Sequence, residues 1–223
     1  MKKILIVCFI VGIVFAFSTN SYAGWELYDD FNSGQIDTQK WEIQESSTAI
    51  TVENGRVKFV HQEGNANDNS WLIIIQNPET VIGIKAEITV VSCQGDVRAR
   101  VSGYAGKIGV NNIWSSLQFK ASDQRIYSEA GLEGPPPNLT WGGNLFWVRY
   151  PEPIAMLGNT FNCKMMFEND KITYEVAGLG KMTYRYSSPK NPADIFFRGV
   201  GTKSENGDGP CTVYFDDVYV FRP

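Results

Sequence analysis

The feature that most constrains the fold of this 223-residue chain is the alternation of apolar and polar residues. In residues 84–90, 97–102 and 171–176 every second side chain is apolar. This period of two is typical of strands that bury one face and leave the other in water. The chain after its first 23 residues shows no comparable helical period. The pattern therefore predicts an all-β protein built from antiparallel sheets.

Short turn signals separate the alternating runs. Glu53-Asn54-Gly55 predicts a hairpin, because Asn and Gly both tolerate the positive φ that a two-residue hairpin turn needs. Glu168-Asn169-Asp170 and Gln94-Gly95-Asp96 are similar turns. Residues 131–138 contain three consecutive prolines and predict a loop, which continues toward Trp141 and Trp147. About a dozen strands joined in this way indicate two packed antiparallel sheets.

The first 23 residues predict a cleavable export signal. Met1-Lys2-Lys3 is followed by an apolar run from Ile4 to Phe17, and Ser21 and Ala23 supply the small residues that a signal peptidase accepts. A retained membrane anchor is the alternative, but the run is shorter than the roughly 20 residues that a spanning helix needs. We expect a signal peptide at 1–23, a single domain at 24–223, and a secreted or periplasmic location in a bacterium.

Composition and cysteine number narrow the class of protein. The 24 acidic residues exceed the 20 basic ones, which argues against a general nucleic-acid binder. No second apolar stretch has membrane length, so we expect no membrane contact after cleavage and a monomer. Cys93, Cys163 and Cys211 remain after cleavage, and their spacing fits no zinc or redox motif. They allow at most one internal disulfide, whose pairing the sequence leaves open.

The two ends of the chain resemble the concanavalin A-like lectin/glucanase superfamily. The segment Leu27–Asp37 followed by Trp41, the hairpin Val52–Phe59 and the closing run Val213–Phe221 carry the resemblance. Residues 65–195 match only in strand rhythm. The resemblance implies a jelly-roll sandwich with one convex and one concave sheet. Laminarinase-like hydrolases, alginate lyase-like enzymes, lectins and non-catalytic carbohydrate-binding modules share this fold, so the fold alone does not decide activity.

The catalytic motifs of these relatives are missing. Laminarinase-like hydrolases carry E-x-D-x-x-E, whereas Glu129 and Glu133 are four residues apart, about 13 Å along a strand, and are interpreted as solvated loop acids. Alginate lyase-like enzymes carry an Arg-Glu-Arg strand and a Gln-x-His pair. Here Arg98-Ala99-Arg100 lacks the glutamate, and His61 is interpreted as packed at a strand end. The sequence thus predicts no catalytic residue.

A calcium site is implied by the resemblance. In laminarinase-like relatives a structural calcium is held by the closing-strand Asp and by the carbonyl of the hairpin glycine, which correspond to Asp216 and Gly55, with carbonyls near Leu27–Tyr28. Because Asp216 and Asp217 are adjacent on one strand, one of them is expected to point toward the interior of the sandwich. The alternative is an Asp216 whose carboxylate is satisfied by backbone N–H groups.

Aromatic and arginine side chains on the middle strands favour sugar recognition, because rings stack on pyranose faces and guanidinium groups pair with acidic sugars. The candidates are Arg98, Arg100, Tyr104, Trp114 and Trp141. The alternative is an ordinary half-exposed sheet face with Trp147 in the core. We expect a secreted, non-catalytic carbohydrate-binding domain for acidic or plant or algal polysaccharide. A hydrolase or lyase with an unrecognised active site, or a structural periplasmic domain, are the alternatives.

Overall fold

A computed structural model describes residues 23–46, 48–62, 69–106, 112–133, 141–191, 197–204 and 209–223, without the side chains at 133, 141 and 142. The predicted export signal, except Ala23, lies outside these residues. None of the helical segments among the described residues is long and apolar enough to cross a membrane.

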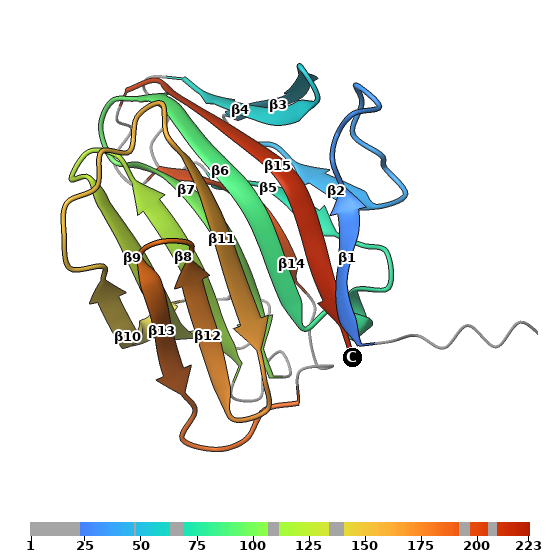
Figure 1. Cartoon of the computed structure of the whole chain (residues 1–223). Helices are drawn as coiled ribbons and strands as arrows, with labels where there is room; N and C mark the ends of the chain where they lie inside the picture. The colour runs from blue at the N-terminus through green and yellow to red at the C-terminus, as the bar shows by residue number, and fades with distance from the viewer. Residues whose placement is uncertain are drawn as a thin grey trace, which may run out of the picture.

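Eight strands form the first sheet, and every neighbouring pair in it is antiparallel. Figure 1 shows that β1 lies beside the C-terminal half of β15, so the two ends of the chain that carry the family resemblance are neighbours in one sheet. Across the sheet the strands are β13 (Gly180–Arg185), β12 (Lys171–Val176), β11 (Thr160–Phe167), β6 (Gly83–Cys93), β15 (Cys211–Arg222), β4 (Arg56–His61) and β3 (Thr48–Glu53), with β1 (Gly24–Asp29) also paired to β15.

Seven strands form the second sheet, which is stacked on the first (Figure 1). It too is antiparallel throughout. A short 3₁₀ turn at Pro78–Thr80 leads from one sheet to the other. Across the sheet the strands are β10 (Trp141–Arg149), β9 (Arg125–Glu133), β8 (Ile113–Lys120), β7 (Val97–Ala105), β14 (Arg198–Ser204), β5 (Asn69–Ile74) and β2 (Trp41–Gln44).

The core lies between the two sheets and is built from the apolar half of each alternating strand. Phe59 and Phe215 meet edge to face at 5.1 Å between ring centroids, and both are fully buried. Phe119 of the second sheet packs against Phe161 of the first at 5.5 Å. The predicted two-sheet antiparallel jelly-roll sandwich is therefore confirmed, with fifteen strands among the described residues where about a dozen were expected.

Two of the predicted turns, at residues 53–55 and 168–170, close antiparallel hairpins, whereas the turn at residues 94–96 leads from β6 of the first sheet to β7 of the second. Asn54 and Gly55 have φ values of 53° and 73°, the left-handed pair that a two-residue turn between β3 and β4 requires. A side chain at Gly55 would also collide with Asn32, since a Cβ there would lie 2.7 Å from Asn32 Oδ1. The loop prediction for residues 131–138 is wrong at its start, because residues 131–133 still belong to β9 and pair with β10.

The closing strand contains a bulge at the two adjacent acids. The register of β15 against β6 shifts between Asp216 and Tyr219, and Asp217 has a φ of 46°. The extra residue shifts the alternation by one position, so that Phe215 before the bulge and Val218 after it both face the core. Both acids are half-exposed. The prediction that one of them points into the sandwich is therefore wrong.

Candidate functional site

The structure brings four predicted residues together on the outer face of the seven-stranded sheet, the face turned away from the core. The alternation of β7 sends Val97, Ala99 and Val101 inward, so the intervening residues face outward. Tyr104 lies opposite Trp114 in the register of β7 and β8, and Arg100 lies opposite Gln118. We call the seven-stranded sheet sheet B, and we refer to this surface as the outer B face. The residues in question are Arg98, Arg100, Tyr104 and Trp114.

A guanidinium between two indoles marks the centre of the outer B face. The Arg100 guanidinium carbon lies 4.2 Å from the ring centroid of Trp71 and 5.7 Å from that of Trp114. Its Nη2 donates a hydrogen bond to Asn69 Oδ1. Such stacking holds a planar cation between two π faces. Only 2% of Arg100 is exposed, so its guanidinium lies within the face and presents little surface to solvent.

Trp71 was not among the predicted site residues. It is placed by the close approach of β5 and β14, where Gly201 lies opposite it in the register. A Cβ at Gly201 would lie 2.5 Å from the Trp71 ring, so this glycine leaves the space that the indole fills. The sequence carries no signal that separates Trp71 from the core residues Leu72 and Ile74, because residues 71–75 are a continuous apolar run.

A second aromatic group lies at the β9–β10 side of the outer B face. The rings of Tyr127 and Trp147 are 5.0 Å apart, and the Arg98 guanidinium lies 5.9 Å from the Trp147 ring. Arg98 also donates to Asp96 Oδ1 at 3.2 Å and to Gln118 Oε1 at 3.0 Å. Trp147 is 42% exposed, so the alternative that placed it in the core is wrong. It offers a ring surface to solvent beside a cation.

Glu129 lies on the same face, in β9, and its position corrects a sequence interpretation. The interpretation as a solvated loop acid is wrong, because Glu129 lies inside β9 and is 6% exposed. It pairs with Ser116 of β8, whose Oγ is 3.4 Å from its Oε2, and Gln118 Nε2 donates to the same oxygen. Burial raises the pKa of the Glu129 carboxyl, although the positive charges of Arg100, Lys203 and Arg98 oppose the rise. Sequence alternation over Arg125–Glu133 was the signal that was missed.

The other candidates are placed as follows. Arg98 and Tyr104 are buried, so these side chains form the floor of the face and are not the half-exposed groups that the sequence indicated. Trp141 is the first residue of β10 and not part of a loop, but its side chain lies outside the described part of the structure. The Glu133 side chain lies outside it too. His61 ends β4, is buried, and its Nδ1 lies 3.2 Å from Thr48 Oγ1, as expected for a packed histidine.

The structure also brings the two predicted calcium residues into one neighbourhood. Phe215 pairs with Val57, two residues after Gly55, and Asp216 follows directly. Burial and the like charges of Asp217 and Glu87 raise the pKa of Asp216, which is the situation that a cation relieves. Its Oδ1, however, accepts the Asp217 backbone N–H at 2.8 Å, as the alternative expected.

These residues fit a calcium ion only in part. Calcium takes six to eight oxygen ligands. Among the residues that the structure describes, no group of three or more His, Cys, Asp or Glu side chains could hold a metal ion. Calcium binding through Asp216 and Gly55 therefore stays a prediction.

Chelation tests it. If calcium is bound there, EDTA at pH 7 should lower the melting temperature by several degrees, because a ligand bound to the native state alone stabilises it. Asp216→Asn should melt at the same temperature with EDTA and with added calcium. A wild-type melting temperature that responds to neither would contradict the site.

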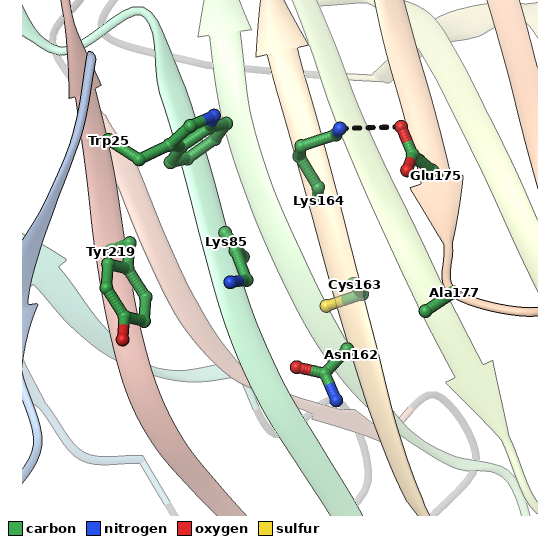
Figure 2. A pocket seen from close by; sticks show the side chains of 8 residues that line it. All are labelled: Trp25, Lys85, Asn162, Cys163, Lys164, Glu175, Ala177 and Tyr219. Carbon is green, nitrogen blue, oxygen red and sulfur yellow. Dashed lines mark ion pairs between the residues drawn. The ribbon is translucent and has the colours of Figure 1, made fainter.

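A pocket opens on the other side of the molecule, on the outer face of the eight-stranded sheet. Its volume is about 390 Å³, and its lining comes from β1, β6, β11, β12 and β15. Figure 2 shows Lys164 and Glu175 joined as an ion pair, at 2.6 Å, and Trp25 and Tyr219 on the opposite wall. The Lys85 ammonium lies 4.5 Å from the Tyr219 ring centroid. None of the predicted binding residues lines this pocket.

Two stacked antiparallel sheets, with the first and last strands paired in one of them, define a concanavalin A-like jelly roll. Solved structures share this fold. The endo-1,3-β-glucanase (laminarinase) catalytic domain of Thermotoga petrophila superposes with a TM-score of 0.62 at 14% identity, covering 90% of this chain and 99% of that one. The κ-carrageenase of Pseudoalteromonas carrageenovora, solved with an oligotetrasaccharide of κ-carrageenan, gives 0.61 at 15% identity, covering 95% and 99%.

A family 7 alginate lyase gives a TM-score of 0.60 at 10% identity, covering 86% of this chain and 97% of that one. At such identities the likeness establishes the fold and no activity. The sequence itself matches no protein-family model and no curated protein.

Proposed function

We propose that this chain is an exported, non-catalytic polysaccharide-binding domain that holds an acidic glycan on the outer B face. The stack of Trp71, Arg100 and Trp114 is the observation that carries the proposal. Trp114 is half-exposed and offers a ring on which a sugar can pack, whereas Trp71 and Arg100 are only 3% and 2% exposed and supply a fixed positive charge beside that ring, which favours an acidic glycan. Trp147 beside Arg98 extends the same chemistry toward β10.

The comparisons support a polysaccharide ligand. Similar folds belong to a laminarinase, a κ-carrageenase bound to an oligosaccharide and an alginate lyase. The charged and aromatic groups lie on strands rather than on flexible loops, so the surface is preorganised, which lowers the entropy cost of binding. The export signal expected in residues 1–23 agrees with a ligand outside the cytoplasm.

Glu129 supports a second candidate, a hydrolase or lyase that uses the same face. A buried carboxyl with a raised pKa is what a general acid requires. A glycosidase also needs a second carboxylate, about 5 to 5.5 Å away in retaining enzymes and roughly 6.5 to 9.5 Å away in inverting ones. Among the described side chains of the outer B face, Glu129 is the only buried carboxylate, which is why binding is our first proposal.

One experiment separates the two functions. The chain is run in native gels that contain alginate, carrageenan, laminarin or pectin, and each polysaccharide is also incubated with it and assayed for reducing ends and for the ultraviolet absorbance of unsaturated products. We expect retardation on an acidic polysaccharide without either product. Products that disappear in Glu129→Gln would establish the enzyme instead. Migration unchanged by every polysaccharide, without products, would leave neither proposal standing.

A further inference from the structure

Two of the three cysteines beyond the predicted export signal are neighbours across two strands. Cys93 is the last residue of β6 and Cys211 the first of β15, and the two are register partners. Partners in an antiparallel pair project from the same face of the sheet. Cys163, by contrast, lies in β11, is buried, and donates its thiol hydrogen to Ala86 O at 3.3 Å. All three thiols are free in this structure, and the fold places only Cys93 and Cys211 opposite each other.

The backbone around the pair identifies its geometry. Gln94 N donates to Pro210 O at 3.0 Å, and these residues directly flank Cys93 and Cys211. A hydrogen bond in that position brackets a non-hydrogen-bonded pair, whose Cα atoms lie about 4.5 Å apart and whose side chains are the closer of the two types. Disulfides span Cα separations of roughly 4.4 to 6.8 Å. The two thiols therefore need no strand movement to meet.

The two sulfurs differ in their access to solvent. Cys93 is half-exposed, whereas only 2% of Cys211 is exposed. A hydrogen bond to Cys93, together with burial, raises the pKa of the Cys211 thiol. An oxidant from solution therefore meets Cys93 first.

We propose that Cys93 and Cys211 form a disulfide that ties β6 to β15, with Cys163 left as a free thiol. The Cys93 thiolate attacks a disulfide oxidant, forms a mixed disulfide and releases one thiol. The Cys211 sulfur then loses its proton, attacks Cys93 Sγ and releases the second thiol. Two electrons and two protons pass to the oxidant, which becomes two thiols.

The expected consequence is stabilisation. The bond closes a long loop, from the end of β6 to the start of β15, that contains most of the seven-stranded sheet. Cross-links that close long loops restrict the unfolded chain most strongly. We expect the oxidised protein to melt roughly 5 to 15 °C above the reduced one.

Peptide mapping tests the pairing. The full chain is incubated with oxidised glutathione, alkylated under denaturing conditions without reductant and digested with trypsin. We expect residues 86–98 linked to residues 204–223, with Cys163 alkylated, and the link lost after reduction. Cys163→Ser should keep the link, and Cys93→Ala should lose both the link and the dependence of the melting temperature on oxidation. Alkylation of both Cys93 and Cys211 after oxidation, or a link that involves Cys163, would overturn the proposal.

Discussion

Replacing Trp114 by alanine is expected to weaken binding to an acidic polysaccharide by roughly 10- to 100-fold, in the range of an aromatic hot spot at an interface. The indole lies on β8 at the side of the Arg100 guanidinium opposite Trp71. Its removal deletes a sugar-stacking surface and also one of the two rings that hold the cation in place. Affinity electrophoresis measures the change as lost retardation, and Trp147→Ala should have an effect of the same order because that ring is more exposed.

Two controls make this result interpretable. Trp114→Phe keeps an aromatic face and should retain most of the binding. Tyr219→Ala removes an aromatic side chain from the pocket on the opposite sheet, shown in Figure 2, and should leave retardation unchanged. If Tyr219→Ala abolishes binding and Trp114→Ala does not, the glycan is held by the pocket of the eight-stranded sheet and the outer B face is not the site.

Glu129→Gln is expected to become more stable relative to the wild type as the pH rises. Because burial raises the pKa of Glu129 in the folded protein, the unfolded chain loses this proton at a lower pH than the folded one. Below about pH 4.5 the carboxyl is protonated in both states and does not affect the difference. As the pH rises through that value toward the folded pKa, the wild type loses stability, by about 1.4 kcal/mol for every tenfold difference in proton affinity between the two states. Glutamine does not ionise and escapes the loss.

Urea unfolding at pH 4 and at pH 8 measures this difference. Glu152→Gln makes the same chemical change at an exposed position and should show no comparable dependence on pH. A stability difference that shrinks with rising pH would mean that Arg100, Lys203 and Arg98 keep Glu129 ionised in the folded protein, and it would also remove the argument for a general acid at this position.

The parts of the fold that depend only on residues close together in the sequence were predictable. Asn54 and Gly55 turn the chain because of their own backbone preferences, and Ile84 to Val90 alternate because a strand buries one side only. The position of Glu129 was missed for a related reason. Its run alternates, yet the prolines that follow it indicated a loop. The bulge at Asp217 was missed because a strand pattern assumes a constant register.

The candidate site was predictable only in its residue types. Arg98 and Arg100 were identified from the face they share on one strand. Their partners come from elsewhere in the sequence: Trp71 is on β5, separated from β7 by β14 in the sheet, and Glu129 is on β9. Nothing local relates these strands, because sheet order follows from non-local pairing.

The alternation of this chain, read alone, determined that it forms antiparallel sheets packed on an apolar core, since burying one face of each strand leaves few other arrangements. Tertiary structure alone decided which strands are neighbours. It placed Trp71 and Trp114 on either side of Arg100, buried Glu129 beside Ser116 and Gln118, and set Cys93 opposite Cys211. The physical reason is that hydrophobic burial is non-directional and fixes which face is hidden, whereas the hydrogen-bonded register between distant strands fixes which side chains meet.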